Sequence, residues 1–337
     1  MTKIKFAICG FGHIGKRHSV IIQNFENTEL VAIIDTDKSV TDNELYPASI
    51  PFFENINEFY LSQTDLDVMV VATPNGTHIE LAETALNHKN HVILEKPMGI
   101  SKVACEQLVH KALNVNRQVF VVKQNRYSPP SKWLKEVVEK KIIGDVYMVQ
   151  LNCYWNRDDR YYKSGGWKGT KNLDGGVLFT QFSHFIDIMF WVFGDIKNIK
   201  TNLQNFNHKH NTEFHDSGNS IFEFINGGLG SINFSTSVWD TNMESSITVV
   251  GSKGSLKIGG QYMNEIEYCH IEGYAKPDLP PTNPPNDYGP FKGSAANHHY
   301  VIENVVNTLN GKDTITANAL EGLKVVDIIE RIYQAAQ

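Results

Sequence analysis

The sequence predicts a two-domain α/β protein: a doubly wound parallel sheet first, then an α+β domain with an open, mostly antiparallel sheet. Three observations support this. Up to about residue 124, short Val- and Ile-rich runs alternate with helical periods, as in a parallel sheet covered by helices. The first run leads into a Gly-rich turn. After about residue 125, apolar and polar residues alternate, and Gly-rich hairpin signals join the runs.

Length and composition agree with this division. The chain has 337 residues, 41% of them hydrophobic, which is enough for two cores. We expect domains at 1–124 and 125–337, the second one binding substrate and mediating oligomerisation. The C-terminal helix could instead pack back on the first domain.

Charge and hydropathy limit the partners. A net charge of −6 argues against non-specific nucleic-acid binding, and no apolar run approaches the 18 residues of a membrane span. The N-terminal segment lacks a signal-peptide core, so we expect a cytoplasmic protein. The cysteines are scattered, which predicts buried thiols and neither a disulfide frame nor a metal site; they are Cys9, Cys105, Cys153 and Cys269.

The elements of the first domain follow in order. Strands are expected at KFAIC, ELVAIID, DVMVVAT, HVILEK and QVFVVK. Helices are expected at HSVIIQNF, INEFYL, HIELAETALNHK and SKVACEQLVHKALN.

The turn after the first strand carries a GxGxxG pattern. Its residues are Gly10, Phe11, Gly12, His13, Ile14 and Gly15. Between a strand and a helix, such glycines permit a tight turn, close approach of a pyrophosphate and close helix packing. We therefore predict a Rossmann domain that binds a dinucleotide. The alternative is a nucleotide-free α/β domain with a Gly-rich turn.

Asp35 ends the second strand, twenty residues after Gly15. A carboxylate there can bind a ribose 2′-hydroxyl and would repel a 2′-phosphate. No Arg follows it in DTDK, so the sequence favours NAD over NADP.

Two loops follow strands at the edge where open α/β sheets bind ligands. The first contains Thr73, Asn75 and His78, and the second contains Glu95 and Lys96. We assign all five to cofactor binding and expect Lys96 to meet substrate oxygens as well. Alternatively, His78 lies near a helix start for structural reasons and Lys96 is a solvated cation.

The second domain begins with a helix at PSKWLKEVVEKKI. Strands are then expected at DVYMVQLNCYW, IKNIKTNLQNF, NSIFEFIN, LGSINFSTSV, SSITVVG, GSLKIG and EIEYCHIE. Two helices, HHYVIENVVNTLN and ALEGLKVVDIIERIYQAA, follow a Pro-rich loop at 276–290. The alternating SINFSTSV face predicts contact with a second copy, as a homodimer or homotetramer.

A helix is expected over 178–193, apolar on most sides. Its polar residues Thr180, Ser183, His184 and Asp187 are spaced i, i+3, i+4, i+7, which places them on one face. We predict that this stripe faces a cleft with water or substrate. The alternative is that these groups satisfy one another in the core, since an unpaired buried polar group costs roughly 1–3 kcal/mol.

Four motifs in this order, GFGHIG, ATPNGTH, EKP and H-F-I-D, resemble the glucose–fructose oxidoreductase, inositol dehydrogenase and rhizopine-catabolism (Gfo/Idh/MocA) family over essentially the whole chain. The resemblance implies NAD(P)-dependent hydride transfer on sugar-like substrates. It also implies that Lys96 contacts substrate and that His184 is the acid–base residue. Many members carry Asp four residues before this His, where the present chain has Thr180.

The segment 154–176 and QNRY at 124–127 resemble the UDP-N-acetylglucosaminuronate 3-dehydrogenases of bacterial surface-polysaccharide biosynthesis. This narrower resemblance implies oxidation of the C3 hydroxyl of a UDP-sugar acid to a 3-keto sugar. The substrate-binding residues it suggests, together with the polar stripe, are Gln124, Arg126, Arg160, Tyr162, Lys168, Thr180 and Asp187. Lys168 stands where these relatives often have Arg. Asp187 could instead orient His184.

The chemistry supports these assignments, because a general base needs a pKa near the working pH and a cation stabilises a developing alkoxide. Cations and aromatic rings alternate in 154–176 and suit a diphosphate or a uronate. They could alternatively pair with the acidic residues Asp158, Asp159 and Asp174. Other functions remain open: a dehydrogenase of inositol or a simple sugar, an NAD-using glycosidase, or a sugar-sensing regulator.

Overall fold

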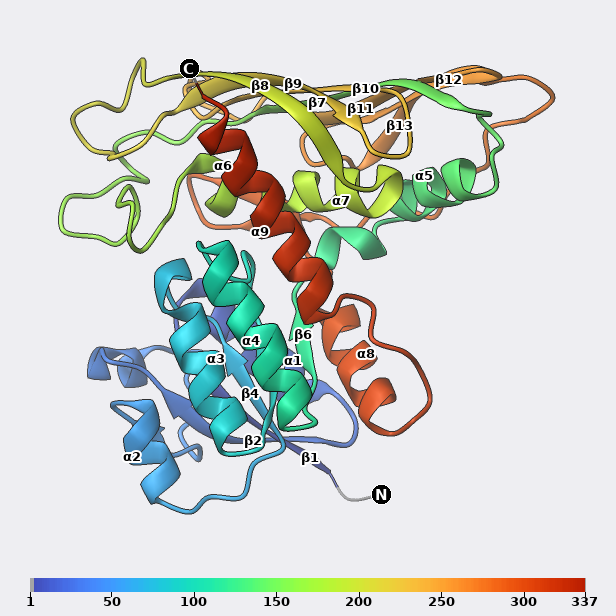
Figure 1. The fold of residues 1–337 in the computed structure, drawn as a ribbon. Helices are drawn as coiled ribbons and strands as arrows, with labels where there is room; N and C mark the ends of the chain where they lie inside the picture. The colour runs from blue at the N-terminus through green and yellow to red at the C-terminus, as the bar shows by residue number, and fades with distance from the viewer. Residues whose placement is uncertain (1–2, 337) are drawn as a thin grey trace. The chain divides into compact units, whose positions relative to one another are not determined.

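The computed structural model describes residues 3–336 and divides into two compact units (Figure 1). Unit 1 comprises residues 1–122 and 298–326, and unit 2 comprises residues 123–297 and 327–337. Unit 1 thus ends two residues before the expected boundary at 124 and includes a later segment of the chain. Within residues 3–336, no helix combines the length and apolarity needed to cross a bilayer.

Unit 1 contains a six-stranded parallel sheet in the order β3-β2-β1-β4-β5-β6. Its strands are β1 (Ile4–Cys9), β2 (Thr28–Ile34), β3 (Phe52–Phe53), β4 (Val68–Val71), β5 (His91–Leu94) and β6 (Val119–Val121). All five expected strands are present. The two-residue edge strand β3 was not expected, because two residues leave no readable periodicity.

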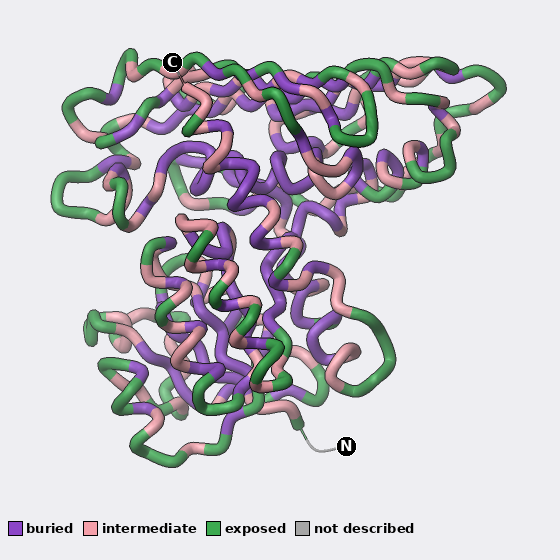
Figure 2. Tube along the Cα trace, in the orientation of Figure 1, coloured by how far each residue is buried: buried purple, intermediate pink, exposed green. Residues whose placement is uncertain are grey.

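The helices of unit 1 lie at the expected segments, except that α1 begins at His13, five residues before the expected start at His18. They are α1 (His13–Asn24), α2 (Ile56–Leu61), α3 (His78–Asn87), α4 (Lys102–Asn114), α8 (His298–Leu309) and the first part of α9 (Ala319–Gln334). Helix α3 packs on α4, and α1 packs on α8. Every residue of β4 is buried, as expected of a central parallel strand, and Figure 2 shows the buried trace running through the middle of unit 1.

Unit 2 contains a seven-stranded sheet in the order β13-β12-β11-β7-β10-β9-β8. The strands are β7 (Val146–Tyr154), β8 (Ile196–Gln204), β9 (Ser217–Phe224), β10 (Leu229–Ser235), β11 (Glu244–Gly251), β12 (Gly254–Gly259) and β13 (Glu265–Ile271). Only the β7–β10 pair is parallel among these described strands. The predicted fold class, a parallel Rossmann sheet followed by an open, mostly antiparallel one, is confirmed.

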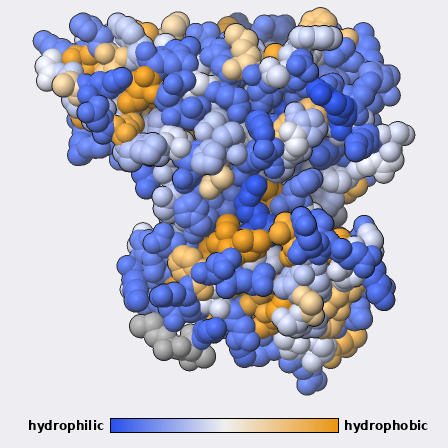
Figure 3. Space-filling view, turned by 180° about the vertical axis from the view of Figure 1, so that it is seen from behind, coloured by the Kyte–Doolittle hydropathy of each residue, from blue (hydrophilic) through white to orange (hydrophobic). Residues whose placement is uncertain are grey.

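One face of this sheet is covered by α5 (Pro129–Glu139), α6 (Val177–Thr180) and α7 (Ser183–Phe193), which Figure 1 shows beneath the strands. Strand β10 alternates buried and partly exposed residues, which fits a sheet packed on one side. The exposed side carries apolar residues at Tyr147, Met148, Ile221, Leu229 and Tyr268. Figure 3 shows hydrophobic residues gathered at one end of this unit. Contact with a second copy stays a prediction.

The single helix expected over 178–193 is wrong, because it is broken between Thr180 and Ser183. The Phe182 N–H donates to Val177 O at 3.2 Å, five residues back, and a new helix begins at Ser183. Gly194, with φ 86°, ends that second helix. Thr180 therefore lies on α6, whereas Ser183, His184 and Asp187 lie on α7.

Two further details differ from expectation. The Pro-rich loop contains β14 (Pro285–Asp287), which pairs in a short ladder with β15 (Lys292–Ala295) just after the loop; their few residues carry no periodicity. Cys269 is only partly buried, because it lies on β13 at the edge of the sheet, whereas the other three thiols are buried as expected. All four are free thiols.

The packing of the Gly-rich turn generates a stability prediction. A Cβ on Gly15 would lie 1.9 Å from Gly10 O, whereas a Cβ on Gly12 would meet nothing within 4 Å. Gly15→Ala should lower the free energy of unfolding by about 2 kcal/mol or more, because backbone must move to relieve the clash. Chemical denaturation checks this, with Gly12→Ala as the matched control. Equal stability of the two variants would contradict the close packing.

Candidate active site

The Gly-rich turn between β1 and α1 forms an open cradle in unit 1. Gly10 has φ 93°, a conformation that L side chains rarely adopt, and its N–H donates to Ile34 O at 2.8 Å. Gly12 caps α1 and has open space where a side chain would stand. Main-chain N–H groups at the start of a helix, with no Cβ in front of them, suit a pyrophosphate. The geometry therefore fits the dinucleotide that the sequence predicts.

Asp35 follows β2 and is tied to the same turn. Its Oδ2 accepts the Phe11 N–H at 2.6 Å, and its Oδ1 accepts the Asp37 N–H at 2.9 Å. Carboxylate oxygens have further lone pairs, so these two bonds leave Asp35 able to accept a ribose hydroxyl. Its role in cofactor selection stays a prediction.

The loop after β4 is held by internal hydrogen bonds. The hydroxyls of Thr73 and Thr77 lie 2.7 Å apart, and Asn75 is buried. The two ring nitrogens of His78 lie 2.8 Å from Pro97 O and 2.9 Å from Thr73 O. Burial lowers the pKa of His78. In this structure His78 links the loops after β4 and β5, which matches the structural alternative named for it.

Glu95 lies in a buried cluster with His18 of α1 and His298 of α8. Its Oε1 is 2.8 Å from His18 Nε2 and 3.7 Å from His298 Nε2. Burial opposes ionisation of Glu95, but the His18 hydrogen bond and nearby positive charge lower its pKa to about 2. Burial lowers the pKa of His298 to about 3. The carboxylate therefore ties α1, β5 and α8 together instead of pointing to solvent.

Could this cluster hold a metal ion? The three potential ligand atoms lie within 4.8 Å of one another. Arg17 and Lys96 act on His298 electrostatically as positive charges, which disfavours a further cation at this site. The existing hydrogen bond already joins His18 Nε2 to Glu95 Oε1, so we assign the cluster a structural role.

Lys96 follows Glu95 and is half-buried. Its N–H donates to Glu95 Oε2 at 3.2 Å, so the buried carboxylate also fixes the backbone of the lysine. Lys96 belongs to unit 1 and His184 belongs to unit 2. That the two act on one substrate atom stays a prediction.

In unit 2, His184 lies on the first turn of α7 and is 6% exposed. Its Nε2 is 3.4 Å from Nε2 of Gln124, which lies on the short 3₁₀ helix η3 (Gln124–Tyr127). The structure thus brings together two residues that are 60 positions apart in the sequence.

Arg126 and Asp187 form a fully buried pair beside this contact. Arg126 Nε donates to Asp187 Oδ2 at 2.9 Å, and Nη2 donates to Oδ1 at 2.8 Å. Lys123 Nζ lies 3.5 Å from the same Oδ1. Burial opposes ionisation of Asp187, but Arg126 and Lys123 outweigh it and lower its pKa. Both residues were predicted to bind substrate; in this structure they bind each other.

Thr180 is likewise engaged within the protein. Its hydroxyl bonds the Asp174 side chain, which also accepts the Gly169 N–H at 2.8 Å. Ser183 Oγ, fully buried, has no hydrogen-bond partner among residues 3–336. The polar stripe is therefore satisfied partly by the protein itself.

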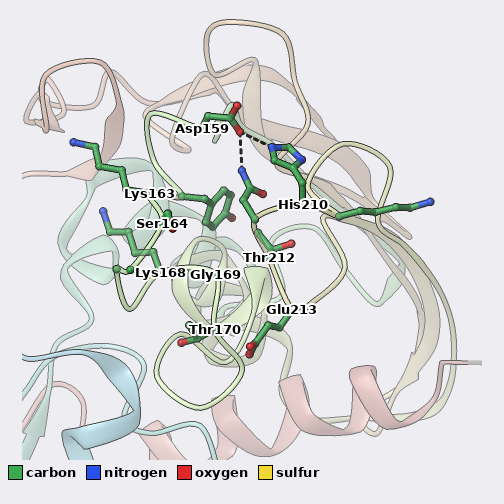
Figure 4. A pocket seen from close by; sticks show the side chains of 14 residues that line it. Asp159, Lys163, Ser164, Lys168, Gly169, Thr170, His210, Thr212 and Glu213 are labelled. Carbon is green, nitrogen blue, oxygen red and sulfur yellow. Dashed lines mark hydrogen bonds and ion pairs between the residues drawn. The ribbon is translucent and has the colours of Figure 1, made fainter.

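The segment 154–176 contributes most of a surface pocket of about 780 Å³, a size typical of ligand sites. Figure 4 shows Lys163 and Lys168 on one side of it and His210, Thr212 and Glu213 on the other. Lys168 is half-buried, with its Nζ 3.9 Å from the Tyr161 ring centroid. Burial and the charge of Arg157 lower the pKa of Lys168 to about 8.

The acidic side chains of this pocket are not paired with its lysines. Asp159 accepts from His210 and Asn211, and Glu213 accepts the Lys171 N–H. Within the described part of the chain, no carboxylate forms an ion pair with the three lysines of the pocket: Lys163, Lys168 and Lys209. The pocket therefore favours an anionic ligand.

The other two residues predicted from this segment differ in their surroundings. Arg160 is exposed and pairs with Asp158 at 2.6 Å, the alternative raised for such residues. Tyr162 lines the pocket, although it is 3% exposed and packs against the rings of Tyr161 and His208.

The buried Arg157 is one of the cations of the segment 154–176, but it is not among the site residues that the sequence predicts. It is 2% exposed, and its Nε donates to Gln181 Oε1 at 2.9 Å. Gln181 Nε2 in turn donates to the hydroxyl of Tyr161 at 2.7 Å, which orients the ring beneath Lys168. The only signal was an Arg in a segment that also contains aromatic residues, and the neighbouring Arg160 shares it.

Comparison with known proteins agrees with this geometry. Residues 4–123 match the oxidoreductase family with an NAD-binding Rossmann fold, and residues 132–257 match the GFO/IDH/MocA C-terminal domain. The crystal structure of the WlbA dehydrogenase from Bordetella pertussis, in complex with NADH and UDP-GlcNAcA, is 29% identical. It has a TM-score of 0.87, and the match covers 99% of this chain and 96% of that chain.

Curated relatives match over shorter regions. An uncharacterized oxidoreductase of Synechocystis is 24% identical over 60% of this chain and 56% of its own length. An inositol 2-dehydrogenase of Salmonella paratyphi B is 25% identical over 58% of this chain and 57% of its own length. The chain thus spans little more than half the length of these two relatives. Together with the glycine cradle, these findings show that the chain is an NAD-dependent oxidoreductase of the GFO/IDH/MocA family.

Proposed function

We propose that the protein oxidises the C3 hydroxyl of a UDP-N-acetylhexosaminuronate to the 3-keto sugar, in bacterial surface-polysaccharide biosynthesis. The observation that carries this proposal is the whole-chain match to a WlbA dehydrogenase in complex with NADH and UDP-GlcNAcA. The lysine-rich pocket of unit 2 supports it, because such a substrate carries a diphosphate and a carboxylate.

The reaction separates a hydride from a proton. When bound, NAD accepts the hydride from C3. His184 takes the proton of the C3 hydroxyl, for which an imidazole suits neutral pH. The Lys96 ammonium stabilises the negative charge that develops on the same oxygen. The products are a ketone, NADH and a protonated base, so atoms and electrons balance.

The pocket lysines recognise the remainder of the substrate. Three lysines line the pocket and form no ion pair among the described residues, so they can bind the anionic groups of the substrate: Lys163, Lys168 and Lys209. Tyr162 supplies an aromatic wall. Arg160 would have to break its ion pair with Asp158 before it could bind the substrate, so we expect it to contribute less to substrate affinity than the lysines.

A second candidate is oxidation of inositol or a simple sugar, favoured by the match to an inositol 2-dehydrogenase. That substrate carries no charge, and it would leave the lysines of the pocket without a partner.

Incubating the purified protein with NAD and UDP-N-acetylglucosaminuronate should produce NADH and a 3-keto sugar, measured by absorbance and by mass spectrometry. UDP-N-acetylglucosamine, which lacks the carboxylate, should react much more slowly. NADH formation with myo-inositol and none with the UDP-sugar acid would contradict the proposal.

Replacing the proposed catalytic residues should separate chemistry from cofactor binding. His184→Asn should lower kcat by roughly 10²–10⁴-fold, because it removes the base. Lys96→Ala should lower kcat sharply as well, because it removes the cation beside the reacting oxygen. Fluorescence titration with NADH should give a near-normal Kd for His184→Asn. Unchanged turnover in both variants would place the chemistry elsewhere.

Lys168 predicts a pH dependence of substrate binding. Because its pKa is lowered to about 8, it is cationic at pH 7 and mostly neutral at pH 9. The Kd of the UDP-sugar acid, measured by calorimetry with NADH present, should rise several-fold over this interval. Lys168→Arg should remove the rise, since the guanidinium stays charged. An identical rise in that variant would rule out Lys168 as its cause.

A further inference from the structure

The contact between Gln124 and His184 is the feature of unit 2 that the proposed chemistry does not yet use. The Gln124 side chain is 2% exposed, and its Nε2 lies 3.4 Å from His184 Nε2. Its Oε1 is buried and has no hydrogen-bond partner among residues 3–336. A buried amide with an unsatisfied oxygen beside an imidazole calls for an explanation, because such a group is costly.

An amide can serve both protonation states of an imidazole. Its NH₂ can donate to the unprotonated Nε2, and after a flip its oxygen can accept from a protonated Nε2. The two ends are nearly equal in size, so the flip needs little space. The distance of 3.4 Å is long for a hydrogen bond, and such contacts commonly tighten when substrate is bound.

The protein holds Gln124 firmly in this place. The Asn297 side chain donates to Gln124 O at 3.2 Å. Arg126, two residues on, is fixed in bidentate fashion to Asp187. Asp187 lies three residues after His184 on α7, so one ion pair fixes the turn that carries the amide to the helix that carries the imidazole.

The acidic groups near α7 are engaged elsewhere. Asp187 binds Arg126, and Asp174 binds Thr180. The charged groups on and beside the elements packed against α7 are Lys123, Arg126, Lys132, Lys135, Glu136, Glu139, Arg157, Asp174 and Asp187. On α5, Glu139 pairs with Lys135 and Glu136 pairs with Lys140. A neutral amide beside the imidazole adds no charge to this set.

We propose that Gln124 is a positioning residue for His184: it orients the imidazole through the contact with Nε2, and it does not bind substrate. Asp187 acts one step further away, by holding the turn of Gln124 against α7. The catalytic part of this inference rests on the proposed function, whereas the contact itself does not.

The test compares Gln124→Met and Gln124→Glu. Histidine-ring NMR, with the His184 signal assigned through His184→Asn, follows titration of the ring without any turnover. Gln124→Glu should move the titration midpoint of His184 upward by roughly 1–2 pH units, because a carboxylate stabilises the imidazolium. Gln150→Glu adds the same charge at an exposed position of β7 and should leave that midpoint unchanged.

Turnover provides the second readout. Gln124→Met should lower kcat by roughly tenfold with little change in KM, because the amide touches the base and not the substrate. In Gln124→Glu, the acidic limb of the kcat–pH profile should follow the NMR midpoint. Circular dichroism and NADH binding show whether each variant is folded. If Gln124→Met does not fold, the test relies on Gln124→Glu alone.

The outcomes separate the two proposals. An unchanged His184 midpoint in Gln124→Glu would overturn this inference, whatever the substrate. A KM increase without a kcat change in Gln124→Met would also overturn it and return Gln124 to substrate binding. A shifted midpoint in a protein that fails to oxidise the UDP-sugar acid would confirm the contact and refute the proposed function alone.

Discussion

The candidate site of unit 2 depends on the buried ion pair between Arg126 and Asp187. Both side chains are almost inaccessible, and Lys123 adds a second cation to the same carboxylate. Breaking such a pair by removing one partner typically costs 3–5 kcal/mol, because the other charge is left buried. That penalty holds the turn at 124–127 against α7, and with it the contact between Gln124 and His184.

The sequence predicts those features that local patterns encode. Unbroken apolar runs identify the parallel strands of unit 1, and alternation identifies the strands of unit 2. The glycine cradle is equally predictable from the sequence, because the backbone geometry that requires Gly10 and Gly15 lies within one stretch of six residues. The break between α6 and α7 cannot be predicted from the sequence, since Gln181 and Phe182 are compatible with a continuous helix.

Pairings between distant residues are the part that could not be predicted. Glu95 follows a strand and looks like a ligand-facing residue, but its partners His18 and His298 come from opposite ends of the chain. Asp187 shares a face with His184, as the spacing indicates, and yet its partner Arg126 is 61 residues away. The spacing of residues along a helix predicts which side chains share a face. It does not predict which side chains of other segments will pair with them.

Residues 298–326 belong to unit 1, so that unit is assembled from two separate stretches of the chain, and α9 continues from it into unit 2 at Asp327. Genetic exchange of residues 123–297, the longer stretch of unit 2, between relatives would therefore require two crossovers, one near Val122 and one before His298. A single crossover would combine α1 and Glu95 of one protein with α8 of the other, so both the α1–α8 packing and the contact of Glu95 with His298 would join residues of different proteins. Such an insertion keeps the resident C-terminal helices, so the end of α9 from Asp327, which belongs to unit 2, must pack on the replacement.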